Sequence, residues 1–599
     1  MNVALLTLVF LSPQVVDVDV IHGPIKSIQS AVNSVQGTPG AKIVVHAGNY
    51  ELAAPIAVHA ASKGLTIEAA TGERPNLIGG STIKNWHREG NLFVAPVSAL
   101  IAENGARMLS VGGNLRPRSR VPETGALVHE TIFTVPWMGT AAGGWQRKPT
   151  DEELHVMKFR AGDIGLWLDP ASAEVTVYHM WDESCVGISS VDFDKREIRF
   201  SSPTGHPAGA FGVQKYVVWN TKAGLTHPGT WFLDRRSRRI FYYPLPGESA
   251  EDLIAIVPST NQLISVEGAE DVTIKGLDLS VTNVSLISAG FGAGNYDGAI
   301  TGVNCARLRL QDLSIRSVAG IAIRVWNSPD GVVSRCQVSQ TGAGGIRFDG
   351  DRATVEDCSV SHIGIQYPSA IGIWVNGVSS VVTHNEVTDT SYTAIIGGGN
   401  SMTISNNYIA RAMLDLHDGG GIYTSACSGV TIKGNLIEKI VDTGGYGASA
   451  YYLDENTHDS KVIENVSSDV ARPTHNHLAQ NNTLSGNLFC TAGDMALSFP
   501  RSERYHVVDN VFSSGRKIEL KTPPNGIETL FGNTFRGTSV DQVRLDLYAE
   551  KEHTPIVVPK SALSPRSIEQ IGPRTWKVVW PGGREQTWDM TTTGPRNSR

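Results

Sequence analysis

Hydrophobic and polar positions follow a repeated phrase between about residue 270 and about residue 535. Each copy has a β-branched or apolar residue, two variable positions, an Asn, Cys or Leu, one more variable position, and then Ile, Val or Phe. After a first copy at residues 273–279, the copies centre on Leu313, Cys336, Cys358, Asn385, Asn407, Asn435, Asn465, Asn487, Asn510 and Asn533. Steps of roughly 22 to 30 residues are typical of stacked coils. The pattern therefore predicts a solenoid.

The content of each repeat indicates which solenoid forms. Residues 402–405 and 430–433 are short alternating segments typical of strands, and Gly, Asn, Asp and Ser separate such segments. Equivalent positions in successive coils lie about 4.8 Å apart, so Asn385, Asn407 and Asn435 should form a ladder of side-chain amides. We predict an all-β protein, a right-handed parallel β-helix, whose handedness is the one usual for such folds.

The limits of the phrase divide the chain into regions. Residues 27–33 indicate a short helix before a strand at 41–50, an arrangement that commonly plugs the end of a β-helix. Aromatic-rich segments without the period, including two strands expected around a turn at 235–238, predict a β-sandwich-like insertion. The predicted regions are a signal-peptide remnant (1–20), an N-terminal cap with the first coils (21–90), the insertion (91–255), the main β-helix (256–540), and a C-terminal cap with a frayed tail (541–599).

Composition and charge narrow the choice of partners. A net charge of −7 and a pI near 6.2 argue against binding to a nucleic-acid backbone. Apart from the apolar start of the chain, no segment approaches the roughly 18 uninterrupted apolar residues that a membrane helix needs. The six cysteines are scattered without zinc-like spacing, so we expect reduced core thiols, no metal and no cofactor. The apolar residues 1–12 indicate a trimmed secretory signal, and we expect a secreted or periplasmic monomer.

Two coils in the middle of the repeat depart from its ordinary pattern, at residues 416–424 and 450–456. Counting back from the ladder asparagines places Asp454 level with Thr424, so Asp418 falls at the start of one strand and Asp454 at the end of the next. Because adjacent coils lie about 4.8 Å apart, we expect the two carboxylates to face one groove. Glycosidases hold their paired carboxylates roughly 5 to 10 Å apart.

Paired carboxylates in a groove suit the cleavage of a glycosidic bond. That reaction needs one carboxyl kept protonated for the leaving oxygen and a second kept ionised as nucleophile or base. Crowding in a partly apolar groove pushes the two pKa values apart. Glycines after Asp418 leave bare backbone for a sugar ring to approach, and tyrosines offer flat faces for it. The candidate residues are Asp418 and Asp454 for catalysis, and His417, Tyr423, Tyr452, Glu455 and Trp374 for substrate contact.

Each candidate also has a structural interpretation. Asp418 would close a turn through its own backbone. Asp454 would occupy a solvated corner, and Glu455 would replace it as the working carboxylate. His417 would be a structural histidine, the tyrosines would stack as a ladder, and Trp374 would pack into the wall.

At these residues the sequence resembles a known family. The strings at 417–424 and 451–454, together with the asparagine ladder, resemble β-helix carbohydrate-active enzymes, most closely glycoside hydrolase family 141. The strings at 116–120 and 231–235 look like recurrent elements of that family, and the likeness spans about residues 25–535. The resemblance implies hydrolysis of a plant-type polysaccharide or oligosaccharide, with xylanase and α-L-fucosidase activities, and two catalytic aspartates that match Asp418 and Asp454. The sequence resembles less closely family 120, β-xylosidases on a similar scaffold.

Two other function classes remain open from the sequence. A polysaccharide lyase or uronate epimerase needs a cation to neutralise a uronate carboxylate and a base for the C5 proton. Its candidates are Arg324, Arg347, Arg352, Asp349 and Asp351. A non-catalytic carbohydrate-binding β-helix protein, similar to a tailspike, is the other class.

Overall fold

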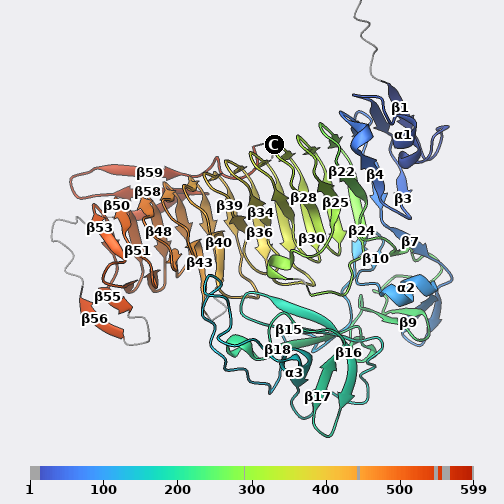
Figure 1. Ribbon diagram of the computed structural model, residues 1–599, viewed down its shortest axis with the longest axis horizontal. Coiled ribbons are helices and arrows are strands. Elements are labelled where there is room, and N and C mark those ends of the chain that lie inside the picture. Colours follow the sequence, from blue (N-terminus) through green and yellow to red (C-terminus); the bar gives the residue numbers. More distant parts are fainter. Residues whose placement is uncertain (1–13, 289, 442–445, 546–550, 556–566, 597–599) are drawn as a thin grey trace, which may run out of the picture.

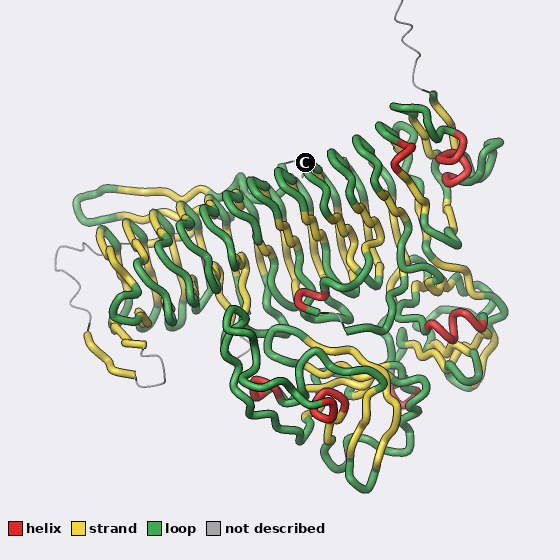
Figure 2. The backbone as a smooth tube through the Cα atoms, in the orientation of Figure 1, coloured by secondary structure: helices red, strands yellow, loops and turns green. Residues whose placement is uncertain are grey.

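The computed structural model describes residues 14–288, 290–441, 446–545, 551–555 and 567–596. Three parallel sheets run along a stack of coils, and the helices are short (Figures 1 and 2). One sheet runs from β1 (Val15–Val18) to β53 (Ile527–Phe531), and another from β3 (Asn49–Glu51) to β54 (Thr534–Arg536). The predicted all-β parallel β-helix is confirmed.

The third parallel sheet, called the site sheet below, carries the residues singled out from the sequence. Its strands are β4 (Ile56–His59), β22 (Ile264–Glu267), β25 (Gly298–Val303), β28 (Ile321–Trp326), β31 (Ile346–Asp349), β34 (Ile373–Asn376), β37 (Ile395–Gly397), β40 (Gly419–Thr424), β43 (Ala448–Leu453), β46 (Thr474–Asn476), β49 (Met495–Ser498), β52 (Ile518–Thr522), β55 (Val540–Leu545) and the antiparallel β56 (Lys551–Pro555). In-register pairing stacks apolar side chains on one another. Ile395, Ile422 and Tyr451, for example, form one column of buried side chains.

The predicted asparagine ladder is present. The Asn385 side-chain amide donates to Asn407 Oδ1 at 3.0 Å, and Asn407 and Asn435 continue the chain of bonds at 3.0 Å each. Each amide also satisfies a buried backbone carbonyl, such as that of Val382. Cys358 continues the column, because its backbone N–H donates to Asn385 Oδ1 at 3.0 Å. All six cysteines are free thiols.

A short helix closes the N-terminal end of the cylinder, as predicted. Helix α1 (Ile28–Ser34) is capped by the Ser27 side chain, which accepts from the Ser30 N–H, and strand β2 (Lys42–Val45) follows it. The buried face of α1 packs into the main core, where it covers apolar groups that the first coil would expose to water. Strand β1 pairs with β2. Residues 1–13 of the predicted signal remnant lie outside the described residues.

The chain leaves the β-helix after β6 (Asn76–Ile78) and rejoins it at β22. The residues between form antiparallel sheets; β19 (Trp231–Asp234) and β20 (Arg239–Tyr242) make the hairpin predicted around residues 235–238. The largest sheet contains β12 (Arg120–Val121), β13 (Leu127–Val128), β14 (Val156–Lys158), β15 (Glu174–Tyr178), β16 (Glu183–Asp192), β17 (Glu197–Phe200) and β18 (Lys215–Trp219). This insertion lies beside the middle of the β-helix (Figure 1).

Buried polar contacts dock the insertion onto the β-helix. The Glu183 carboxylate accepts from the Ser369 N–H at 2.7 Å, and the Arg107 guanidinium donates to the Val284 carbonyl at 2.7 Å. Arg107 also pairs with Glu174 at 2.7 Å, with both side chains almost fully buried. A buried charge without partners is costly, so these contacts define how the two parts fit together.

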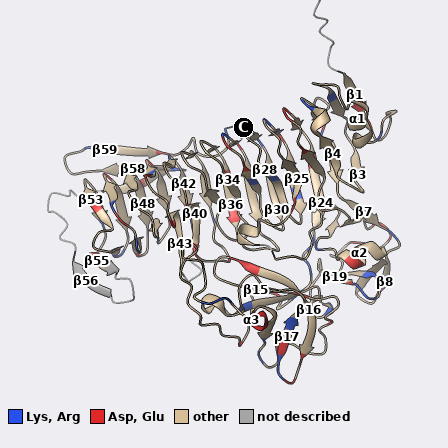
Figure 3. Cartoon of the chain, in the orientation of Figure 1, with Lys and Arg blue, Asp and Glu red and all other residues tan. Residues whose placement is uncertain are grey.

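The C-terminal residues fold back along the β-helix. Strands β57 (Ser567–Gly572), β58 (Thr575–Val579) and β59 (Glu585–Asp589) form an antiparallel sheet whose tryptophans pack on the outward side chains of Leu436, Val466, Leu488 and Val511. The prediction of a frayed end is wrong for the described residues up to 596, because the Arg596 guanidinium binds Asp357 at 2.7 Å. Positive and negative side chains are interspersed along the molecule (Figure 3).

Candidate active site

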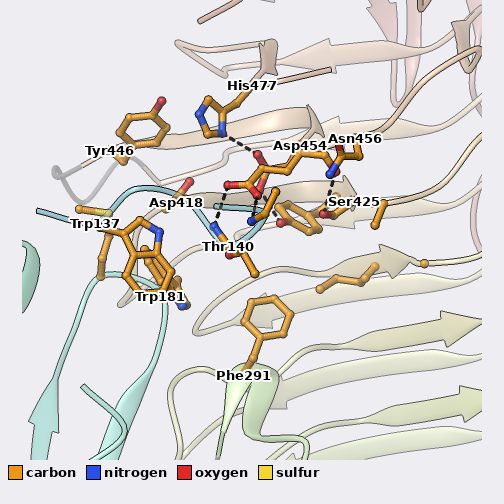
Figure 4. A pocket seen from close by; sticks show the side chains of 18 of the residues that line it. Trp137, Thr140, Trp181, Phe291, Asp418, Ser425, Tyr446, Asp454, Asn456 and His477 are labelled. Carbon is orange, nitrogen blue, oxygen red and sulfur yellow. Dashed lines mark hydrogen bonds and ion pairs between the residues drawn. The ribbon is translucent and has the colours of Figure 1, made fainter. Parts of the chain in front are cut away.

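A cavity of about 630 Å³ opens where the insertion faces the site sheet. The β-helix supplies its floor and the insertion supplies an aromatic wall (Figure 4). The lining residues are Trp137, Gly139, Thr140, Ala141, Met180, Trp181, Phe211, Phe291, Trp374, Asn376, Tyr392, Ile396, Gly398, Asp418, Tyr423, Ser425, Ala426, Tyr446, Asp454, Glu455, Asn456, His477 and Arg501. The structure thus brings Asp418 and Asp454 into one cavity.

The register between the two central coils differs from the predicted one by one residue. Tyr423 pairs with Tyr452, and Thr424 pairs with Leu453 rather than with Asp454. The cause is the corner that follows each strand. His458 is bridged to Ser428 of the preceding coil. The corner between Leu453 and His458 has one more residue than the corner between Thr424 and Ser428. The longer corner moves Asp454 beyond the end of β43.

Two donors hold the Asp454 carboxylate. The Tyr423 hydroxyl donates to Oδ2 at 2.7 Å, and His477 Nδ1 lies 2.8 Å from Oδ1. Arg501 lies 2.6 Å from His477 Nε2. Because a guanidinium can only donate, Nε2 must accept, which leaves the histidine proton on Nδ1 for Asp454. This arrangement suits an ionised carboxylate.

Asp418 lies in a different environment at the start of β40. Its backbone is fixed in the left-handed region (φ 58°), with its N–H donating to the Gly447 carbonyl and its carbonyl accepting from the Tyr392 hydroxyl at 2.7 Å. Burial, and then the negative charge of Asp454, raise the pKa of Asp418 to about 7. The Asp418 carboxyl group accepts a side-chain hydrogen bond from the Tyr452 hydroxyl at 2.8 Å.

Tyr423 and Trp374 line the cavity, as expected for substrate contacts. The Trp374 indole N–H donates to Asn376 at 3.0 Å, and its ring packs edge-on to Phe291 with centroids 5.6 Å apart. Tyr452 is fully buried beneath Asp418 and does not line the cavity. His417 also lies outside the lining, and its backbone N–H donates to the Met180 carbonyl of the insertion. Tyr452 and His417, for which the sequence predicted substrate contacts, therefore do not line this cavity.

Glu455 lines the cavity but is already engaged. Its carboxylate accepts from the backbone N–H groups of Thr140 at 3.2 Å and Ala141 at 2.8 Å, both in the insertion. A carboxylate committed to two backbone donors is a poor substitute for Asp454. Glu455 acts as a contact between the two parts of the molecule.

Several cavity residues were missed in the sequence. His477 could have been found from its position in the repeat. Tyr452 pairs with His475, so His477 directly follows its strand, as Asp454 follows the strand of the preceding coil. The aromatic residues of the insertion, Trp137, Trp181 and Phe211, gave no such signal, because they lie more than 200 residues from Asp454 along the chain.

The residues considered for lyase or epimerase chemistry do not line the cavity. Arg347 pairs with Asp349 at 2.9 Å, and Arg352 pairs with Asp330 at 2.6 Å. The Asp351 carboxylate accepts from the Val378 N–H, and Arg324 donates to the Tyr296 carbonyl. Among the described residues, no cluster of three or more His, Cys, Asp or Glu is arranged to hold a metal ion. Within the same residues, no helix is both long and apolar enough to span a bilayer.

Comparisons with known proteins agree with the fold. Residues 344–517 match a family described as the right handed beta helix region, which confirms the predicted handedness. A solved structure titled "Glycoside hydrolase" has a TM-score of 0.64 at 17% identity, and the match covers 79% of this chain and 96% of the chain in that structure. The complex of XylC with xylose has a TM-score of 0.50 at 9% identity, and the match covers 93% of this chain and 86% of the XylC chain. No curated protein matches the sequence. At these identities the likeness is one of fold.

Proposed function

We propose that the protein is a glycoside hydrolase that cleaves a plant-type polysaccharide or oligosaccharide, either xylan-like or fucosylated, with Asp418 as general acid and Asp454 as nucleophile or base. One observation carries the proposal: two carboxylates share a cavity but lie in contrasting environments. Burial and a neighbouring charge favour a protonated Asp418. The Tyr423 hydroxyl and His477 favour an ionised Asp454. Glycoside cleavage requires this division of roles.

The acid step begins at Asp418. A carboxyl with a pKa of about 7 is protonated in mildly acidic solution and transfers its proton readily near neutrality. The Tyr452 hydroxyl occupies Oδ1, and Oδ2 has no hydrogen-bond partner among the described residues. In our proposal Oδ2 carries the proton, gives it to the glycosidic oxygen, and leaves Asp418 ionised as the leaving group departs.

Asp454 stabilises the positive charge that develops on the sugar. As a nucleophile it would attack the anomeric carbon, and water would then release the sugar with Asp418 acting as base. As a base it would take a proton from the attacking water. The first course retains the anomeric configuration and the second inverts it, so the first-formed anomer distinguishes them.

Aromatic side chains around the acids suit a sugar ring. Trp374, Tyr423 and Trp137 present apolar faces to the cavity, and Asn376 and Tyr446 add polar groups. The resemblance to family 141, and a fold shared with XylC, lead us to test xylose and fucose first. We also propose that the protein is secreted or periplasmic, where a polysaccharide substrate would be met, and that it acts as a monomer.

The test is a screen of aryl glycosides and plant polysaccharides for released sugar. NMR of the first product identifies the anomer. We expect turnover of at least one xyloside, fucoside or xylan, and loss of that turnover in Asp418→Asn. An absorbance rise from unsaturated uronate, on pectin or alginate, would instead favour a lyase.

A further inference from the structure

A loop of the insertion, residues 136–146, forms one wall of the cavity. The loop closes on itself, because the Gln146 N–H donates to the Pro136 carbonyl at 2.9 Å and the Met138 N–H donates to the Gly144 carbonyl at 2.9 Å. Its Trp137 ring packs against Trp181, with centroids 5.4 Å apart. Figure 4 shows both rings beside the acid pair. The base of this loop is thus fixed within the insertion.

The tip of the loop is held by the β-helix instead. Glu455 Oε1 and Oε2 accept from the N–H groups of Thr140 and Ala141, which are more than 300 residues away in the chain. Gly139 has a φ of 106°, which other residues rarely adopt, and a Cβ there would lie 3.0 Å from Glu455 Oε1, so a larger residue would strain the backbone and press on the carboxylate. Hydrogen bonds to an ionised acceptor are about twice as strong as neutral ones.

The location of this contact gives it a function. Glu455 directly follows Asp454, so the corner that presents one acid to the cavity also holds the loop that carries Trp137. Residue Glu455 is only 9% exposed, although a carboxylate is costly to bury without partners. Its two backbone partners account for that burial.

Resting on the proposed function, we infer that Glu455 is a positioning residue that latches loop 136–146 over the acid pair. Contacts within the insertion hold the Trp137 ring, and the latch holds the tip of the same loop against the corner beside Asp454, so that the ring faces the cavity as a stacking surface for the sugar. The corner at residues 454–456 then sets the position of the acid and the width of the cavity together. Releasing the latch weakens substrate binding but leaves the acids in place.

Hydrogen exchange at the loop tip tests the latch without a substrate. In Glu455→Ala, the amides of Thr140 and Ala141 lose their acceptor, and we expect their exchange to accelerate by about tenfold or more. Glu455→Gln keeps one acceptor oxygen, so its effect should be smaller. The matched control is Glu464→Gln, an exposed carboxylate paired with Lys433. Unchanged exchange at the loop tip in Glu455→Ala would overturn the inference.

Kinetics test the role of the latch in binding. With the best aryl glycoside from the screen, Glu455→Ala should raise KM by about five- to tenfold and change kcat by less than about threefold. Trp137→Ala should have a similar effect, and the double variant should add little, since both changes remove one surface. A fall in kcat with unchanged KM would contradict a positioning role. If the wild-type protein cleaves nothing in the screen, the proposed function and the sugar-stacking role of Trp137 both fail, whereas hydrogen exchange still decides the latch.

Discussion

The hydrogen bond from Tyr452 to Asp418 gives a quantitative test of the acid assignment. Tyr452→Phe removes the hydroxyl that donates to Asp418 Oδ1 at 2.8 Å. The ring remains, and so does its edge-on packing against His475 at 4.6 Å and Tyr423 at 5.0 Å. The perturbation is therefore confined to one donor beside the proposed acid.

The sign and size of the effect follow from the charge state that the bond favours. A donor stabilises the ionised carboxylate, and the Tyr452 hydroxyl accordingly lowers the pKa of Asp418, which burial and Asp454 have raised to about 7. A hydrogen bond to a charged group contributes about 1.5 kcal/mol, which corresponds to about one pKa unit. Removing it should raise the pKa of Asp418 to about 8.

The assay is the pH dependence of kcat/KM, which reports the ionisation of the free enzyme. An acid must be protonated to work, so activity should fall on the alkaline side near pH 7 in the wild-type protein and about one unit higher in Tyr452→Phe. At pH 8 the protonated fraction then rises from about a tenth to about a half, a gain of about fivefold.

Tyr408→Phe is the control, because its hydroxyl bonds Glu438 outside the cavity. An alkaline limb that stays in place in Tyr452→Phe, or moves to lower pH, would refute Asp418 as the acid.

Three further predictions follow from the same structure. Asp418→Asn and Asp454→Asn should each reduce hydrolysis by at least about a thousandfold with little change in thermal unfolding, and near-normal turnover in either variant would remove that residue from the mechanism. Asn435→Ala breaks bonds with both ladder neighbours and should cost about 2–4 kcal/mol in urea unfolding, whereas the exposed Asn525→Ala should cost almost nothing. Burial and the charge of Asp182 raise the pKa of Glu183 from its ordinary 4.5 to about 8. The folded protein keeps a proton that the unfolded chain releases, so stability present below pH 4.5 is lost as the pH rises towards 8. The unfolding midpoint of Glu183→Gln should therefore fall less over that range than that of the wild-type protein.

The predictability of this protein depends on whether a feature repeats. The ladder that includes Asn385 and Asn407 follows from the sequence, because stacking places the same position of each coil against the next. The register at Asp454 does not follow as well, because corner lengths differ from coil to coil and one added residue shifts the count. Trp137 gave no signal, since its place in the cavity depends on how the insertion docks, which is determined by buried contacts such as Glu183 with Ser369.

The division between repeat and insertion also explains why the site lies where it does. Within the site sheet, Trp374, Ile396, Tyr423 and Tyr452 form one column, and such a column alone makes an even surface rather than a cavity. Asp418 directly precedes β40 and Asp454 directly follows β43, and both strands are paired on each side, so the two proposed acids are attached to a rigid frame. Loops tolerate sequence change better than the strands of the β-helix do. We therefore expect changes in loop 136–146 to alter which glycan fits while the alkaline limb of the pH profile, which depends on Asp418, remains in place.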